Sequence, residues 1–166
     1  MAARILVAGI GNIFLGDDGF GSEVVRQADI PQDDESVRVV DYGIRGMHLA
    51  YDLLEDWDTL VLVDAVPNQG RPGTLHVFQA DHETWPSTSA LDAHSMDPET
   101  VFSSLRALGG RPPYTVVVGC EAGNLEEGIG LTDPVAKAVP RAARAVEEIV
   151  AALRIGATAA PAREEC

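Results

Sequence analysis

The sequence is poor in cysteine, in cationic residues and in long apolar runs. It has two cysteines among 166 residues, and one of them, Cys166, is the last residue. A disulfide framework of the kind that small secreted domains use is therefore excluded. No apolar run approaches the roughly 20 residues that cross a bilayer. Residues 1–4 lead directly into an apolar run, which leaves no room for a signal peptide, so we expect a cytoplasmic protein that contacts no membrane.

The shortage of cations excludes a further class of partners. Twelve lysines and arginines stand against 26 aspartates and glutamates, giving a formal net charge of −14 at pH 7. No basic stripe is available to neutralise phosphates, so we expect no nucleic-acid partner. Much of the charge is typical of a solvated surface, and a basic protein partner stays open. The apolar content of 46% suffices for one domain over residues 1–156, with a disordered tail expected at 157–166.

Apolar runs alternate with amphipathic stretches along the chain. We expect strands near residues 5–9, 37–42, 59–65, 73–78 and 114–119, and helices near residues 19–28, 47–55, 98–108 and 133–154. This alternation is typical of an α/β fold with parallel strands. The fourth run follows the third without a helix between them, so it is expected to pair antiparallel at an edge of the sheet.

Two adjacent carboxylates, Asp17 and Asp18, follow the first predicted strand in a glycine-rich loop. Open α/β sheets hold their chemistry where a strand leads into a helix N-terminus. Gly9 and Gly11 match the start of a dinucleotide fingerprint, but Phe14 replaces its third glycine and the carboxylates would repel a pyrophosphate. Oxygen ligands suit a hard or borderline metal ion better. The alternative is that one carboxylate simply caps the helix.

Two more residues are candidates for the same site. Asp64 ends the most apolar predicted strand, and parallel strands end at one edge of a sheet. It has a simpler interpretation as an acceptor for backbone amides in the turn to Pro67. His94 lies in a long polar stretch, residues 79–95, ahead of a helix that Asp97 is expected to cap. Neutral imidazole is a common ligand of nickel or zinc, although a lone loop histidine is more often an ordinary one.

Four other residues that stand out in the sequence are expected to have structural roles. His76 alternates with apolar neighbours on a predicted strand and is expected to be satisfied or solvent-facing. Cys120 is expected to be a packed residue, because a nucleophile needs a base and a lowered pKa. Thr132 is expected to cap the last helix, and Pro140 to kink it.

The order and spacing of these pieces resemble the hydrogenase maturation endopeptidases, which trim the C-terminus of [NiFe]-hydrogenase large subunits. The resemblance runs from residue 5 to about residue 153. It rests on Gly9-x-Gly11-Asn12, Gly16-Asp17-Asp18-Gly19-x-Gly21, Asp41-x-Gly43-x-x-Gly46-Met47, Val63-Asp64-Ala65, His94 before a helix, and Gly130-Leu131-Thr132.

The resemblance implies an α/β/α sandwich on a twisted, mostly parallel five-stranded sheet. It implies the hydrolysis of one peptide bond in a large-subunit precursor after nickel has been loaded. Asp18, Asp64 and His94 match the metal-site residues of the family, with the nickel arriving in the substrate and not as a permanent cofactor. Asp17 and Asn12 are then expected to shape the first loop without binding metal.

The second loop of the family is thought to meet the substrate. Asp41, Gly43 and Gly46 are therefore candidate substrate-binding residues. The family pattern Asp-Gly-Gly-Thr-x-Gly is broken here by Tyr42 and Ile44, which leaves the hydrogenase subgroup open.

Two other functions also stay open: a nickel-sensing chaperone that cleaves nothing, or another metal-dependent peptidase on a related sandwich. The second usually needs more ligands than this chain's one cluster offers. Water activation by the metal or by carboxylates is equally compatible with the residues.

Overall fold

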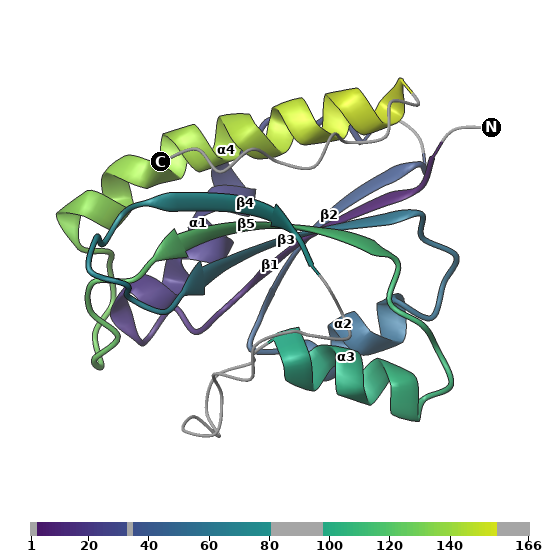
Figure 1. The fold of residues 1–166 in the computed structure, drawn as a ribbon, viewed down its shortest axis with the longest axis horizontal. Helices are drawn as coiled ribbons and strands as arrows, with labels where there is room; N and C mark the ends of the chain where they lie inside the picture. Colours follow the sequence, from purple (N-terminus) through teal and green to yellow (C-terminus); the bar gives the residue numbers. More distant parts are fainter. Residues whose placement is uncertain (1–2, 33–34, 81–97, 156–166) are drawn as a thin grey trace.

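The computed structural model describes residues 3–32, 35–80 and 98–155, and it contains a five-stranded mixed sheet between two layers of helices (Figure 1). The strands are β1 (Ile5–Ile10), β2 (Val37–Gly43), β3 (Thr59–Val66), β4 (Leu75–Gln79) and β5 (Tyr114–Glu121). Their order is β2-β1-β3-β5-β4, and every pair is parallel except β4 with β5. The antiparallel edge strand is confirmed.

The helices of the described residues cover both faces of the sheet. They are η1, a 3-10 helix (Gly16–Gly19), α1 (Phe20–Gln27), α2 (Gly46–Asp52), α3 (Pro98–Ala107) and α4 (Asp133–Arg154). Helices α1 and α4 pack on one face, and α2 and α3 pack on the other (Figure 1). The three-layer sandwich implied by the resemblance is confirmed. Among these residues no helix is long and apolar enough to cross a membrane.

Alternate residues of β1 feed two separate cores. Ile5 and Val7 join the cluster beneath α1 and α4, whereas Leu6 and Ala8 join the cluster beneath α2 and α3. All residues of β1 are buried, which is why its sequence is continuously apolar instead of alternating. Each fully buried leucine or isoleucine contributes about 1.5–3 kcal/mol to folding. The sheet is therefore a rigid base for the loops at its edges.

Gly21 allows α1 to begin directly against the sheet. A Cβ atom at this position would collide with the carbonyl oxygens of Val63 and Ile10. The N-terminus of α1, and η1 before it, therefore lie at the carboxyl ends of β1 and β3. Close approach at a glycine thus places the first loop at this edge of the sheet.

Most predicted boundaries agree with the structure within a few residues, and the largest difference is at the end of α2, predicted at Glu55 and found at Asp52. The predicted helix from Gly19 begins at Phe20 and is preceded by η1, which no local pattern indicated. Thr132 occupies the N-cap position of α4, but its side chain makes no cap hydrogen bond. The predicted side-chain cap is wrong, and the Thr132 hydroxyl is instead oriented toward buried Asp17, to which it donates a charge-assisted hydrogen bond. The predicted tail at 157–166 and the predicted cap at Asp97 lie outside the described residues.

Candidate functional site

The loop after β1 holds its two carboxylates in different surroundings. The side chain of Asp17 is fully buried, whereas Asp18 is half-buried. Asp18 Oδ2 accepts a hydrogen bond from the Asn12 N–H at 2.6 Å. Asn12 Oδ1 in turn accepts from the Phe14 N–H at 2.9 Å, so Asn12 shapes the turn as expected. Neither helix end beside this loop has a side-chain cap, so the capping alternative is wrong for η1 and α1.

Asp17 accepts four hydrogen bonds from the segment that follows β5. Its Oδ2 accepts from the Gly123 N–H at 2.7 Å, the Asn124 N–H at 2.9 Å and the Thr132 hydroxyl at 2.8 Å. Its Oδ1 accepts from the Thr132 N–H at 2.7 Å. Burial alone would raise the pKa of Asp17, but these bonds, led by the Thr132 amide, lower it. Asp17 is therefore an ionised structural acid, and its loop-shaping role is confirmed.

Backbone hydrogen bonds extend this junction. The Asp17 N–H donates to the Asn124 carbonyl at 2.8 Å, and the Gly16 N–H donates to the Gly128 carbonyl at 2.9 Å. The Gly128 N–H returns a bond to the Phe14 carbonyl, also at 2.9 Å. Gly16 and Gly128 take positive φ values of 56° and 152°, which favour glycine. Residues 11–18 and 122–132, called the loop pair below, thus form one hydrogen-bonded unit.

Asp64 lies near the end of β3, the strand beside β1. Its side chain is 9% exposed, and it pairs in register with Gly119 of β5. Helix η1, which carries Asp18, packs against β3. Asp18 and Asp64 therefore lie on neighbouring elements at the same edge of the sheet.

His94, the third predicted ligand, lies outside the described residues. Within residues 3–32, 35–80 and 98–155, no three side chains of histidine, cysteine, aspartate or glutamate gather as a metal site. The metal-binding set of Asp18, Asp64 and His94 stays a prediction.

Asp41 organises the connection between β2 and α2. Its Oδ1 accepts from the Ser22 hydroxyl at 2.7 Å and from the Gly43 N–H at 3.1 Å. The Gly43 carbonyl accepts from the Gly11 N–H at 3.0 Å, which ties this connection to the first loop. Gly46 begins α2. Asp41 therefore positions the second loop, and its contact with a substrate stays a prediction.

The two departures from the family pattern have opposite environments. Tyr42 is buried, and its hydroxyl donates to Asp52 Oδ2 at 2.6 Å. Ile44 is 56% exposed. Tyr42 thus anchors α2 to the sheet, whereas Ile44 contributes to the surface.

Glu121 is a buried carboxylate at this edge that the sequence analysis did not select. Its carboxylate accepts from the Gln69 N–H at 2.8 Å and the Arg71 N–H at 3.2 Å, and it lies 2.8 Å from His76 Nε2. The bond with His76 lowers the pKa of Glu121, burial opposes it, and the backbone bonds add to the lowering. An acid at the end of an apolar strand, the signal used for Asp64, marks this residue too. His76 is satisfied, as expected.

Cys120 is buried in the cluster beneath α1 and α4. Burial, with the nearby charge of Asp17, raises the pKa of the Cys120 thiol to about 12. The interpretation of Cys120 as a packed residue is confirmed.

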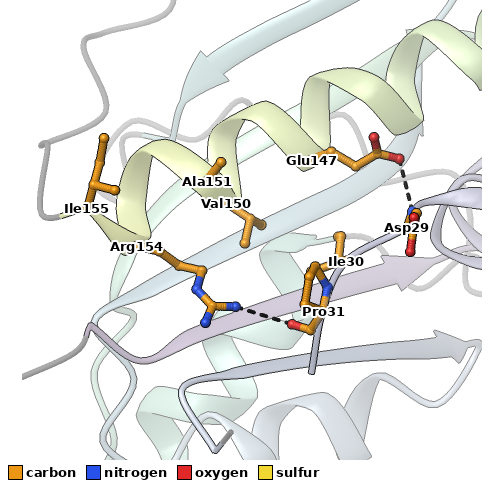
Figure 2. Close-up of a pocket in the computed structure, with 8 residues that line it drawn as sticks. All are labelled: Asp29, Ile30, Pro31, Glu147, Val150, Ala151, Arg154 and Ile155. Atoms are coloured by element: carbon orange, nitrogen blue, oxygen red, sulfur yellow. Dashed lines mark hydrogen bonds between the residues drawn. The ribbon is translucent and has the colours of Figure 1, made fainter. Parts of the chain in front are cut away.

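A pocket of about 380 Å³ opens at the opposite, amino edge of the sheet (Figure 2). It lies between the segment after α1 and the last turns of α4. Two polar contacts cross it: the Asp29 N–H donates to Glu147 Oε2 at 2.9 Å, and the Arg154 guanidinium donates to the Pro31 carbonyl at 3.3 Å. None of the predicted site residues lines it.

Comparison with known proteins identifies the family to which this sequence and fold belong. A family model described as HycI, hydrogenase maturation protease, matches residues 23–149. The chain belongs to the hydrogenase maturation protease family. As a member of this family it is a peptidase, and therefore a hydrolase.

Relatives and solved structures extend the match over nearly the whole chain. The hydrogenase 2 maturation protease of Escherichia coli is 32% identical over 166 residues and covers 97% of each chain. Coenzyme F420 hydrogenase subunit delta of Methanothermobacter thermautotrophicus is 37% identical over 150 residues, 84% of this chain and 90% of its own. The hydrogenase maturating endopeptidase HybD of E. coli superposes with a TM-score of 0.74 at 30% identity, over 92% of this chain and 94% of its own. The family membership indicated by the sequence motifs is thereby confirmed.

Proposed function

We propose that this protease removes the C-terminal extension of a nickel-loaded [NiFe]-hydrogenase large-subunit precursor, and that Asp18, Asp64 and His94 contact the substrate's nickel. The observation that supports this most is the placement of two carboxylates, from η1 and β3, at the carboxyl edge of the sheet in a hydrogenase maturation protease. Family names such as hydrogenase 2 maturation protease indicate the substrate class.

The donor set suits a metal ion that another protein brings. Two carboxylates and one imidazole bind a free divalent ion less firmly than a built site with more ligands and a supporting shell. Asp18 is oriented by the Asn12 N–H, and Asp64 is held on a buried strand, so both carboxylates are placed before the substrate arrives. Thiolates of the precursor would supply the other ligands, and cleavage would then depend on nickel loading.

Hydrolysis needs water to attack the scissile carbonyl carbon while the C–N bond breaks. One proton leaves the water, and one proton must reach the departing amine. Asp18 or Asp64 is suited to take the first proton and return it to the amine, because an ionised carboxylate acts as a general base and its acid form as a general acid. The substrate's nickel, if it lies near the scissile bond, would polarise the carbonyl and favour the same attack.

The test uses protease stripped with a chelator, mixed with apo precursor and with nickel-loaded precursor. Mass spectrometry is expected to show shortening of the loaded form alone. Equal shortening of both forms would contradict nickel sensing. Binding without shortening would favour the chaperone alternative, and hydrolysis of unrelated small peptides would favour a general metallopeptidase.

A histidine substitution tests the third ligand. His94→Ala is expected to abolish processing with a nearly unchanged thermal midpoint, because residues of a predicted loop contribute little core burial. His48→Ala is the matched control, since His48 lies half exposed on α2, and it is expected to process normally. A collapsed thermal midpoint in His94→Ala would show instead that the histidine is structural.

A further inference from the structure

The carboxyl edge of the sheet exposes a concentration of apolar side chains. Eleven large apolar residues are exposed among the residues that the structure describes. Six of them lie at this edge, five in its connections and Met47 in the first turn of α2: Ile13, Phe14, Ile44, Met47, Leu125 and Ile129. A single exposed apolar residue is ordinary, but several on neighbouring connections mark an interaction surface.

Phe14, Leu125 and Ile129 belong to the loop pair and are 59%, 48% and 79% exposed. The Phe14 carbonyl accepts from Gly128, the residue just before Ile129. A parallel bridge joins Leu15 to Gly128 at the same place. The three side chains are therefore carried by one backbone unit, although the two loops are far apart in the sequence. We call these three residues the apolar rim.

The apolar rim is held in place before any partner binds. The buried Asp17 carboxylate fixes both loops through its bonds to Gly123, Asn124 and Thr132. A surface that is already ordered loses little conformational entropy on binding, so more of the contact energy appears as affinity. The structural role of Asp17 and the exposure of the rim are thus parts of one arrangement.

We propose that the apolar rim docks an apolar segment of the hydrogenase large-subunit precursor that has cationic side chains beside it. The inference rests on the proposed function, because the loop that carries Phe14 also carries Asp18, and a substrate that reaches Asp18 must lie against this loop. Glu126 and Glu127 are exposed between Leu125 and Ile129 in a chain of net charge −14, so a segment with positive charge beside its apolar residues is the one that complements the rim. The precursor is therefore recognised by a surface beside the carboxylates as well as by its metal.

The experiment compares serine variants at the two edges of the sheet. Phe14→Ser and Ile129→Ser remove rim side chains, and Ile155→Ser, at an 82% exposed residue directly after α4, is the matched control. Affinity for the nickel-loaded precursor is measured by isothermal titration calorimetry, and kcat and KM by mass spectrometry of the product. Each rim variant is expected to weaken binding and raise KM about 10-fold to 100-fold, with kcat within about twofold of the wild type. Ile155→Ser is expected to match the wild type.

Two further variants sharpen the result. Phe14→Leu keeps an apolar side chain and is expected to retain most of the affinity that Phe14→Ser loses. Glu126→Gln with Glu127→Gln is expected to weaken binding at low ionic strength and to have little effect at high salt.

The outcomes separate the two proposals. Unchanged affinity in the rim variants, an equal loss in Ile155→Ser, or a fall in kcat alone would each overturn the docking surface. If wild-type protease binds the precursor and does not cleave it, the proposed function fails, and the titrations still decide the docking surface. If the precursor does not bind at all, the docking surface is overturned.

Discussion

Among the residues that the structure describes, the two edges of the sheet differ in the side chains that they present. The amino edge has a pocket of about 380 Å³, whose polar contacts link the segment after α1 to α4 (Figure 2). The carboxyl edge has the strand-end carboxylates, the loop pair and the apolar rim. Large concave pockets are typical of sites for small molecules. None of the residues that line this pocket is a candidate site residue, so the proposal assigns it no part in the reaction.

The strongest test of this comparison is the removal of one charge at the carboxyl edge. Asp18→Asn keeps an acceptor for the Asn12 N–H, so the thermal midpoint is expected to change by only a few degrees. Processing of the loaded precursor is expected to fall at least about 100-fold, because the variant loses one of the two carboxylates proposed to contact the nickel and to act as general base. The measurement is kcat by mass spectrometry of the product.

Asp29→Asn at the amino edge is the matched control for Asp18→Asn, and it is expected to process normally. An equal loss of activity in the two variants would break the distinction between the edges.

The neighbouring carboxylate is expected to affect stability more than chemistry. Asp17→Asn presents an amide to a site built from N–H and O–H donors, so at least one donor loses its acceptor. The free energy of unfolding, measured by urea denaturation, is expected to fall by about 3 kcal/mol, because the variant loses hydrogen bonds to a charged acceptor and leaves a buried donor unpaired. A change below about 0.5 kcal/mol would show that the loop pair is held by its backbone bonds alone.

The sequence predicts those features of the carboxyl edge that depend on a local sequence pattern. Continuous apolar runs predict β1 and β3, and parallel strands that end together predict that Asp18 and Asp64 share an edge. The missing helix before β4 predicts its antiparallel pairing. These signals depend on residues close in sequence or on a general rule of sheet topology, so they do not need the tertiary structure.

Contacts between distant loops have no such pattern. The partners of Asp17 lie 106 to 115 residues further along the chain. A local rule assigned Thr132 to a helix cap, while in the fold its hydroxyl donates to this carboxylate. Phe14 and Ile129 are apolar residues in glycine-rich loops, and nothing in the sequence distinguishes their exposure from burial. The loop pair and its apolar rim therefore required the structure.

Lowering the pH is expected to destabilise the folded protein moderately, because it protonates the structural carboxylates Asp17 and Glu121. The pKa values of Asp17 and Glu121 are lowered in the folded protein, so both residues stabilise it above their unfolded pKa values of about 4. This stabilisation is lost as the pH falls through the folded pKa values. As the pH is lowered below about 4, the thermal midpoint of the wild type is expected to fall. The thermal midpoint of Asp17→Asn is expected to fall less steeply over the same range. Parallel curves would exclude Asp17 as a source of the acid sensitivity.

The smallest effects are expected at the amino edge. Glu147→Gln keeps an acceptor for the Asp29 N–H, and Arg154→Ala removes one long hydrogen bond to a carbonyl. Each is expected to change the free energy of unfolding by less than about 0.5 kcal/mol and to leave kcat/KM unchanged. A large loss of processing in either variant would assign the pocket a role in the reaction.

The sequence separation between Asp17 and its partners also determines when, during synthesis, the loop pair can form. A ribosome adds about 5–20 residues per second, and Thr132 is made 115 residues after Asp17. A nascent chain that ends at β5 has every strand of the sheet and lacks Gly123, Asn124 and Thr132, so its Asp17 carboxylate has none of those donors. The loop that carries Asp18 therefore gains these hydrogen bonds only after the start of α4 has been synthesised.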